Sequence, residues 1–584
     1  MKSITIQWGQ ENEQRVGRHE ERRSNHGCGQ PTRTRKKERK IGKMKKGIAM
    51  LLTLALLLTV LPAALAEDNA PDLKGTTIRI LSEDCFSSDA SWANILPLYA
   101  KVEADTGVKL DWEIITSDYT NIMLTRLAGS ADGSPDIVQL NTDAGTWAKL
   151  IEDGVLVNIK ELMDENAPHL AQFFREKRPD IMGSMTYVDG GIYTIPDAAY
   201  ETVEDFYGKL ATSGDNILMY RADLAEKLNI EEPKTIEDLH KMLLAFKAYD
   251  ASIIPLHIWN YTSWQSIRVF ANCYGLKWAN PNTGSNFFRA NDDGTVEFTA
   301  ITDEAKAWVK EMATWVSEDL VSTTVNAEDK MGLPGTGKVG VCYVGNYGTM
   351  QELNKLLEDN GVEGAYFKAL PWLTGPNGEK GIGTRVSFEN AIGIVDNGDT
   401  EQIKKVLQYI DYTYFTDEGI ISQALGVQGV NWDYDADGQP RLNDETIQAW
   451  YVDKTSSLQK MGGNGHCRMP QVYRQSLREY MDQVAIEAGA KKAKTEEELK
   501  VCQDWADAAF LSYPFMYYTA EEQAVIDDIF GDLGTYVNEM INRFVLGELD
   551  IDENWDEFVS NVKAMNIDTV VAAYQSAYDR YLGK

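Results

Sequence analysis

The sequence contains few cysteines and few histidines for its length. Six of each are spread over 584 residues, and no two cysteines form a C-x-x-C pair. Beyond residue 66 an odd number of cysteines remains, which argues against a complete disulfide framework and predicts buried free thiols. These cysteines are Cys85, Cys273, Cys342, Cys467 and Cys502.

The familiar catalytic motifs are also missing. The chain has no G-x-S-x-G elbow, no H-E-x-x-H pair and no complete phosphate-binding loop. The only close pair of nitrogen and sulfur ligands is His466 beside Cys467, and adjacent residues rarely reach one metal ion together. We therefore predict no catalytic residue, no cofactor and no metal site.

One segment partly matches a calcium-binding loop. In "DYDADGQP" three aspartates, Asp433, Asp435 and Asp437, alternate ahead of Gly438. The twelfth position of the loop is Asp444, whose side chain is shorter than the glutamate that usually binds calcium with both oxygens. A hairpin turn rich in Asp and Gly is the preferred interpretation, and a metal site is the alternative.

No apolar stretch reaches the roughly 20 residues that span a bilayer. The longest apolar run, Leu51 to Leu61, follows Lys45 and Lys46 and leads into the small residues of Ala64-Leu65-Ala66. This pattern is typical of a secretory signal peptide, here residues 44–66, with cleavage after Ala66. Residues 1–43 are basic and lack apolar periodicity, so they form either a disordered leader or a stretch preceding the true start at Met44.

Basic residues are scarce once the signal peptide is removed. Residues 1–66 hold 14 Lys and Arg but 5 Asp and Glu, so residues 67–584 keep 43 basic and 84 acidic residues and a net charge of −41. Such a chain repels polyanions, which excludes nucleic acid and anionic lipid and favours a neutral ligand or a cation. Its length exceeds one hydrophobic core and suggests at least two lobes.

Strand-like and helix-like segments alternate along the chain, which indicates an α/β fold. "TTIRIL" (76–81) alternates as a strand, and the following helix is expected to end at Gly107. Thr235 is predicted to cap a helix whose apolar face includes Leu239 and Phe246. Near the C-terminus, helical spacing predicts a core-packing face of Val570, Val571, Tyr574, Ala577, Tyr578 and Tyr581.

Several aromatic residues lie in or beside predicted loops. Flat apolar rings with amide and carboxylate neighbours are suited to the face of a sugar. Carboxylate pairs for glycoside hydrolysis also remain open, because sequence spacing does not give distance in space. The aromatic residues are Trp259, Tyr261, Trp264, Tyr343, Tyr347 and Trp372.

Blocks of the chain resemble, in order, the extracellular solute-binding proteins of ABC importers, in particular the carbohydrate group that includes maltose-binding protein. The resemblance covers most of 75–432, and the C-terminal tail looks like that of a longer subgroup, often lipid-anchored, from Gram-positive bacteria. The similar blocks are "YAKVEADTGVKLDWE", "SPDIVQLNTDAGTWAKLIEDGVLVNI", "VDGGIYTIP", "ILMYRADLAEKLNIEEPKTIEDL" and "YFTDEGIISQALGVQG".

This resemblance implies a two-lobed α/β fold of the type 2 periplasmic-binding-protein class, with hinge-crossing segments and a helical C-terminal extension. The two lobes are expected to close around a ligand by hinge motion. The predicted divisions after the leader and signal peptide are residues 67–215 for the first part of the N-lobe, 216–387 for the first part of the C-lobe, 388–440 for the second part of the N-lobe, and 441–584 for the rest of the C-lobe and the helical C-terminal region.

The chain departs from the family at two places. Many members of the subgroup carry a calcium loop after the helix that corresponds to "LLAFKAYD", whereas here "AYDASIIPL" runs directly into the next strand. Cys85 lies too far beyond Ala66 to be a lipid-modified first residue. We therefore expect neither that calcium site nor a lipid anchor.

The resemblance also places ligand-binding residues. "NYTSW" aligns Tyr261 with a sugar-contacting position and Trp264 beneath it, and "VGNYG" places Tyr347 in an exposed turn with its ring against a sugar. "QLNTDAG" puts Asp143 in a loop that binds sugar hydroxyls, although Leu140 stands where the family has a tryptophan. Asp84 follows the first strand, where similar acids of the family contact ligand. Loop position alone suggests Tyr200, Trp259 and Arg385.

The implied function is that of a secreted, monomeric, non-enzymatic binding protein. It would capture an oligosaccharide or related sugar between its lobes and deliver it to the transmembrane subunits of an ABC permease, at the extracellular face of the membrane or in a periplasm. The alternatives are a secreted polysaccharide-degrading enzyme and a binding protein for another solute, such as a peptide.

Overall fold

The computed structural model describes residues 70–84, 96–129, 133–140, 144–200, 217–258, 264–278, 287–322, 331–345, 347–384, 391–463, 469–511 and 513–584. The predicted leader and signal peptide therefore lie outside the described residues. Within these ranges no helix combines the length and the apolar composition needed to cross a membrane.

The first sheet has five strands in the order β2-β1-β3-β13-β4. The alternation of "TTIRIL" is confirmed, since Ile78 and Ile80 are buried on one side of β1. Strand β13 comes from far along the sequence and runs antiparallel between β3 and β4. The strands are β1 (Thr77–Glu83), β2 (Lys109–Ile115), β3 (Ile137–Leu140), β4 (Thr194–Ile195) and β13 (Ala391–Ile394).

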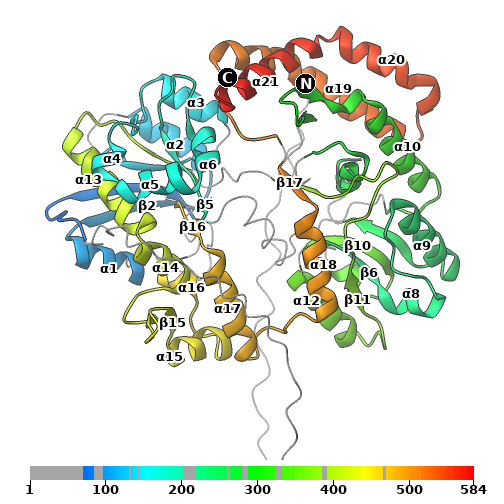
Figure 1. Cartoon of the computed structure of the whole chain (residues 1–584), viewed down its shortest axis with the longest axis horizontal. Coiled ribbons are helices and arrows are strands. Elements are labelled where there is room, and N and C mark those ends of the chain that lie inside the picture. Colours follow the sequence, from blue (N-terminus) through cyan, green and yellow to red (C-terminus); the bar gives the residue numbers. More distant parts are fainter. Residues whose placement is uncertain are drawn as a thin grey trace, which may run out of the picture. The chain divides into compact units, whose positions relative to one another are not determined.

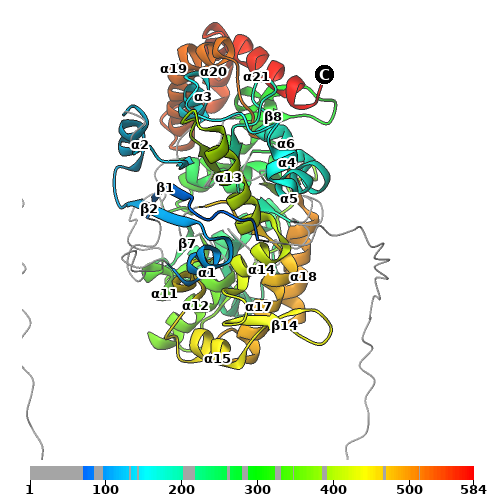
Figure 2. The same ribbon diagram turned by 90° about the vertical axis from the view of Figure 1, so that its left-hand side faces the viewer.

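Helices pack on this sheet and share one apolar core with it. The first helix ends, as predicted, at Gly107, whose φ of 75° is accessible because glycine lacks a Cβ. Figure 2 shows α4, α5 and α6 grouped beside α13. The elements are α1 (Pro97–Thr106), α2 (Tyr119–Leu127), α3 (Ala144–Glu152), α4 (Met163–Asn166), α5 (Pro168–Gln172), η1 (Phe173–Lys177), α6 (Pro179–Met185), α13 (Thr400–Ile410), η6 (Asp411–Phe415) and α14 (Asp417–Leu425).

The second sheet has four strands in the order β11-β6-β10-β7, flanked by α8, α9 and α12 (Figure 1). The predicted cap of α9 is confirmed, because Thr235 and Asp238 form a reciprocal capping box. The face containing Leu239 and Phe246 is fully buried. The elements are β6 (Ile217–Arg221), α8 (Ala222–Leu228), α9 (Ile236–Tyr249), β7 (Ile254–Ile258), β10 (Val339–Gly345), α12 (Tyr347–Asp359) and β11 (Phe367–Ala369).

Further elements extend this second core, including three C-terminal helices. The predicted apolar face of the last helix is confirmed, since Val570, Tyr574 and Ala577 are buried and the Tyr574 ring stacks on Phe288 at 3.8 Å. The elements are η2 (Trp264–Tyr274), β8 (Phe288–Ala290), β9 (Val296–Phe298), η4 (Thr299–Ile301), α10 (Asp303–Ser317), α11 (Gly332–Gly335), α18 (Glu496–Asp507), α19 (Ala520–Val545), α20 (Ile551–Ala564) and α21 (Ile567–Tyr581).

The remaining described elements form a small third apolar cluster and short strand pairs. The segment "DYDADGQP" forms the predicted hairpin, with β14 antiparallel to β15. The elements are β14 (Trp432–Tyr434), β15 (Pro440–Leu442), α15 (Asp444–Ile447), η7 (Gln448–Val452), α16 (Leu458–Met461), β16 (Val472–Tyr473) and α17 (Gln475–Glu487). Strand β5 (Ala198–Ala199) pairs with β16, and β12 (Ile382–Thr384) pairs with β17 (Ala509–Leu511).

The chain passes between the two cores more than once. Residues Met469 and Val472 pack in the first core, although they fall in the segment 441–584 that we assigned to the second lobe. Further along, Tyr513 packs in the second core and Tyr517, four residues later, in the first. The exact lobe boundaries remain a prediction.

Three of the expected thiols lie among the described residues; they are buried and form no disulfide with one another: Cys273, Cys342 and Cys502. Burial raises the pKa of Cys273 to about 12, so this thiol stays protonated at neutral pH. Cys85 and Cys467 lie outside the described residues.

Candidate functional site

The carboxyl ends of β1, β2, β3 and β4 lie at one edge of the first sheet. These strands run parallel to one another, and β13 begins at the same edge with Ala391 opposite Leu140. Ligands of open α/β sheets bind outside the carboxyl ends of the strands. We term this border the first edge.

The second sheet has a corresponding border, which we term the second edge. Strands β7 and β10 are parallel and end there, with Tyr343 opposite Ile258. Strand β6 is antiparallel to β10 and begins there, with Ile217 opposite Gly345. Strand β11 is antiparallel to β6 and so also ends at the second edge.

Four predicted ligand-binding residues lie outside the described residues: Asp143, Trp259, Tyr261 and Arg385. Their neighbours in sequence can nevertheless be placed. Strand β3 ends at the first edge three residues before Asp143, and β7 ends at the second edge directly before Trp259. Trp264 is the first residue of η2, but its side chain is not described. The binding role of these residues stays a prediction.

Asp84 is placed at the first edge, directly after β1. Its backbone N–H donates to the carbonyl of Ile115 at 2.8 Å, which joins the ends of β1 and β2. The residue is half-buried. Its position agrees with the expectation of an acid after the first strand, while ligand contact remains untested.

Sequence reasoning missed a buried polar network behind the first edge. Gln139 lies on β3 with no exposed surface, and its Oε1 accepts hydrogen bonds from Ser82 Oγ (3.1 Å) and the backbone N–H of Glu83 (2.8 Å). The hydroxyl of Tyr119 donates to the carbonyl of Gln139 at 2.7 Å. A glutamine within the apolar strand "DIVQL" was the available signal. The network fixes β1 against β3 where the candidate site begins.

Tyr200 follows β5, and its ring is already in contact with protein groups. The Arg474 guanidinium lies 4.3 Å from the ring centroid, and the ring of Phe173 lies 6.0 Å away. The backbone N–H of Tyr200 donates to the carbonyl of Tyr473 at 2.8 Å. These contacts give Tyr200 a part in joining β5 to β16, and its predicted ligand contact is not tested by them.

Tyr347 is not in an exposed turn, so that expectation is wrong. It is the first residue of α12, only 3% of it is exposed, and it belongs to the second core. Lys494 Nζ lies 5.1 Å from its ring centroid. Burial, followed by the neighbouring Glu498 carboxylate, raises the pKa of Tyr347 well above its usual value. Tyr347 is buried because α18, which begins just after Lys494, packs against it from a distant part of the chain.

Two other aromatic residues expected in or beside loops are also buried. Tyr343 and Trp372 are each 7% exposed and belong to the second core. Tyr343 lies within β10, where a strand packed on both faces buries it.

The described residues contain no group of three or more His, Cys, Asp or Glu side chains arranged to hold a metal ion. Asp250 follows α9, and its Oδ1 accepts the Ser252 N–H at 2.8 Å, which lowers the pKa of this carboxyl. In the β14–β15 hairpin, Asp435 Oδ1 accepts the N–H groups of Asp437 and Gln439. Both aspartates thus organise turns.

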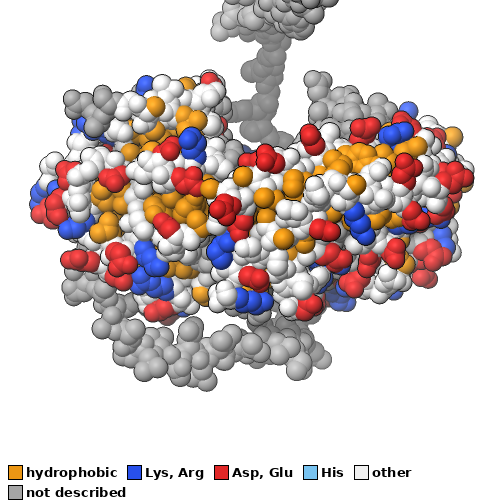
Figure 3. All heavy atoms as spheres, turned by 90° about the horizontal axis from the view of Figure 1, so that it is seen from above, with side chains coloured by type: hydrophobic (Ala, Val, Ile, Leu, Met, Phe, Trp, Pro, Cys, Tyr) orange, Lys and Arg blue, Asp and Glu red, His pale blue; other side chains and the backbone are white. Residues whose placement is uncertain are grey.

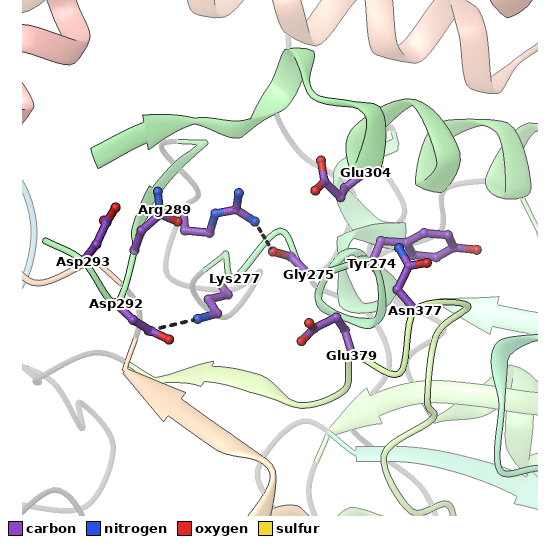
Figure 4. A pocket seen from close by; sticks show the side chains of 10 residues that line it. Tyr274, Gly275, Lys277, Arg289, Asp292, Asp293, Glu304, Asn377 and Glu379 are labelled. Carbon is purple, nitrogen blue, oxygen red and sulfur yellow. Dashed lines mark hydrogen bonds and ion pairs between the residues drawn. The ribbon is translucent and has the colours of Figure 1, made fainter. Parts of the chain in front are cut away.

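An open cavity of about 360 Å³ lies at the C-terminal end of η2 (Figure 4). Its lining holds four carboxylates and two cationic side chains. Arg289 donates to the Gly275 carbonyl at 2.5 Å, and Lys277 lies 3.4 Å from Asp292. Near this end of η2 the thiol of Cys273 donates to the carbonyl of Leu373 at 3.2 Å, so the cavity lies beside the loop that follows β11. We term it the η2 cavity.

Comparison with known proteins gives a family match over more than half of the chain. The profile of the bacterial extracellular solute-binding protein family matches residues 89–417. The fructooligosaccharide ABC transporter substrate-binding protein FusA of Streptococcus pneumoniae serotype 4 is 24% identical over 569 residues, which cover 91% of this chain and 97% of the relative.

Solved structures share the fold. FusA of S. pneumoniae in complex with kestose has a TM-score of 0.60 at 20% identity and is covered completely by 87% of this chain. A solute-binding protein of Bifidobacterium longum infantis described as binding HMO has a TM-score of 0.63 at 18% identity, over 87% of this chain and 99% of its own. These likenesses confirm the predicted two-lobed α/β fold.

Proposed function

The chain belongs to the bacterial extracellular solute-binding proteins, and from this premise we propose that it captures a neutral oligosaccharide for an ABC importer. The family membership confirms the resemblance inferred from the sequence. It also confirms a binding protein rather than an enzyme, since members of this family bind solutes and are not hydrolases.

The observation that carries the choice of a sugar is the similarity to FusA over nearly the full length of both chains. A relative that matches only one lobe would share half of a binding site, whereas this one shares both lobes. Both edges therefore belong to a chain that matches a fructooligosaccharide-binding protein over nearly its full length.

Charge narrows the class of sugar. The net charge of −41 beyond residue 66 opposes an anionic polysaccharide, because approach of a polyanion is electrostatically unfavourable. Figure 3 shows acidic side chains spread across the face seen from above, interspersed with basic and apolar ones. A neutral oligosaccharide meets no such barrier.

We assign ligand contact to residues that follow the strands at the two edges. Asp84 and Asp143 would accept hydrogen bonds from sugar hydroxyls at the first edge, and Trp259 and Tyr261 would stack on sugar rings at the second edge. Trp264 and Arg385 complete the proposed set. Tyr200 belongs to this set as well, whereas Tyr347 is left out because it is buried.

Calorimetric titration of the purified protein with kestose, maltotriose and a tripeptide tests the function. We expect heat of binding and a rise in melting temperature for one of the sugars, and recovery of that sugar intact by mass spectrometry. Binding of the tripeptide alone, or cleavage of the sugar, would overturn the proposal.

A matched pair of variants tests the site. Tyr261→Ala removes a ring that we place on the sugar, which should weaken binding by roughly five- to a hundredfold, or about 1 to 3 kcal/mol. Tyr249→Ala removes a tyrosine that is 42% exposed at the end of α9, far from β7's carboxyl end, and should leave the affinity unchanged. Equal affinities for the two variants would remove Tyr261 from the site.

Export and partner follow from the same proposal. The protein would be secreted through the signal peptide at 44–66, begin at Glu67, and deliver its sugar as a monomer to the transmembrane subunits of a permease. N-terminal sequencing of the exported protein checks the start. Residues from 1–43 on the exported form would contradict it.

A further inference from the structure

A second cavity, of about 380 Å³, lies beside the carboxyl end of β11. Its lining comes from the segment before α9, from the loop after β11 and from α18. We term it the α18 cavity. Its size falls within the range of small-molecule sites, which begins at about 300 Å³.

The register of the second sheet places this cavity at the second edge. Ala369 at the end of β11 lies opposite Met219, and the N–H of Leu370 donates to the carbonyl of Leu218 at 2.9 Å. The next residues, Pro371 and Trp372, line the cavity. Two strand spacings of about 4.8 Å separate β11 from β10, so the cavity lies roughly 10 Å along the edge from the loop after β10.

Helix α18 fixes one wall of the cavity. Asp504 accepts the backbone N–H of Trp372 at 3.0 Å and pairs with Lys380 Nζ at 2.6 Å. The indole N–H of Trp505 donates to the carbonyl of Leu370 at 2.9 Å. Because these bonds join the helix to the loop on both sides, the cavity is preformed.

The lining combines an apolar surface with balanced charge. Pro371, Trp372 and Val501 supply the apolar part, and three carboxylates and three lysines supply the polar part. The η2 cavity, in contrast, carries four carboxylates against two cationic groups. Balanced donors and acceptors around an apolar surface suit a neutral polyhydroxylated ring better than an anion or a cation.

Two further observations describe what the lining offers a ligand. The Trp372 indole Nε1 has no accessible surface, so this residue offers a ligand apolar surface rather than a hydrogen-bond donor. Lys234 and Lys500 line the cavity, and the Lys234 ammonium interacts electrostatically with Glu232 on the same lining. Hydroxyls bound in the cavity would supply acceptors for these ammonium groups.

From these observations we propose that the α18 cavity is an additional sugar subsite, which takes the far end of an oligosaccharide whose first rings lie between the two edges. The inference rests on the proposed function. Lys234, Lys500 and Trp372 would contact only longer oligosaccharides and so make the protein prefer them. Helix α18, which carries Lys500, would thereby influence which chain length is bound.

The test measures affinity against chain length in two neutral series, fructans from kestose upward and maltodextrins from maltotriose upward. The variant Lys234→Met/Lys500→Met removes two ammonium groups from the lining but keeps their apolar stems. We expect its affinity for the longest sugar of the series that binds to fall by about tenfold or more, and its affinity for the shortest to stay within about twofold of the wild type.

A matched control carries the same change of charge elsewhere. Lys109→Met/Lys563→Met alters the exposed start of β2 and the exposed side of α20, both away from the two edges, and it should leave every affinity unchanged. Melting temperatures of both variants establish that they are folded.

The outcomes separate the two proposals. Unchanged affinity of Lys234→Met/Lys500→Met for every length, or an equal loss for every length, would overturn the subsite while leaving the sugar-binding function in place. Absence of binding by the wild-type protein to both series would overturn the proposed function, and the subsite with it.

Discussion

The two edges are built in different ways. At the first edge, the side chain of Gln139 joins neighbouring strands through hydrogen bonds to Ser82 and Glu83. At the second edge, the start of α12 and the loop after β11 contact α18 and the residues just before it, which lie more than a hundred residues further along the chain. The first edge is held by side chains of the strands that form it, whereas the second edge depends on a segment that packs on it from elsewhere in the chain.

The largest expected effect comes from removing a ring under α18. Tyr347→Ala truncates a buried aromatic side chain, which costs about 3 to 5 kcal/mol of unfolding free energy. Urea unfolding measures this loss. Tyr347→Phe keeps the ring and should cost about 1 kcal/mol or less. A stable Tyr347→Ala protein with a large loss of sugar affinity would instead restore the exposed ring that the sequence predicted.

At the first edge we expect a smaller loss of unfolding free energy. Gln139→Leu keeps the approximate size of the side chain but removes the oxygen that accepts hydrogen bonds from the Ser82 hydroxyl and the Glu83 N–H, which should cost about 1 to 3 kcal/mol of unfolding free energy. Gln439→Leu, in the exposed hairpin, serves as the control and should stay within about 0.5 kcal/mol of the wild type. Equal stabilities of the two variants would show that the network does not hold the first edge.

An ion pair between Glu522 and Arg580, near the C-terminus, should make the stability of the protein depend on pH. Glu522 accepts two hydrogen bonds from Arg580, at 2.7 and 2.5 Å, and caps α19 through the N–H of Thr519. Burial opposes ionisation of Glu522, but the bonds from Arg580 and Thr519 outweigh it and lower the pKa of this carboxyl.

Because the folded-state pKa of Glu522 is depressed, its contribution to stability is present above the unfolded value of about 4.3 and is lost as the pH falls through the folded value. Glu522→Gln should therefore cost about 1 to 2 kcal/mol at pH 7 and less at acid pH. Unfolding curves at several pH values measure the difference, and a gap that stays constant down to the acid range would refute the assignment.

The smallest expected effect is that of a chelator. The carboxylates of Asp250 and Asp435 accept backbone N–H groups in their turns, so we expect no structural requirement for calcium at either place. Treatment with EDTA should leave the melting temperature unchanged. A fall of several degrees would establish a calcium site in one of these turns.

The sequence by itself determined the elements and the family. The capping box at Thr235, the glycine that ends α1 and the helical spacing around Tyr574 involve residues within a few positions of one another, so local geometry fixes them. The order of the similar blocks fixed the two-lobed fold. The assignment of the loops after β3 and β7 to the site also came from the sequence, and it stays a prediction.

Only the tertiary structure decided which aromatic rings are buried. Tyr347 and Trp372 are flanked by turn residues and look exposed in the sequence, but α18 covers the first and bonds to the backbone of the second. The α18 cavity has the same origin, because its walls come from three distant segments. Burial depends on what packs against a residue from elsewhere in the chain, and local sequence does not contain that information.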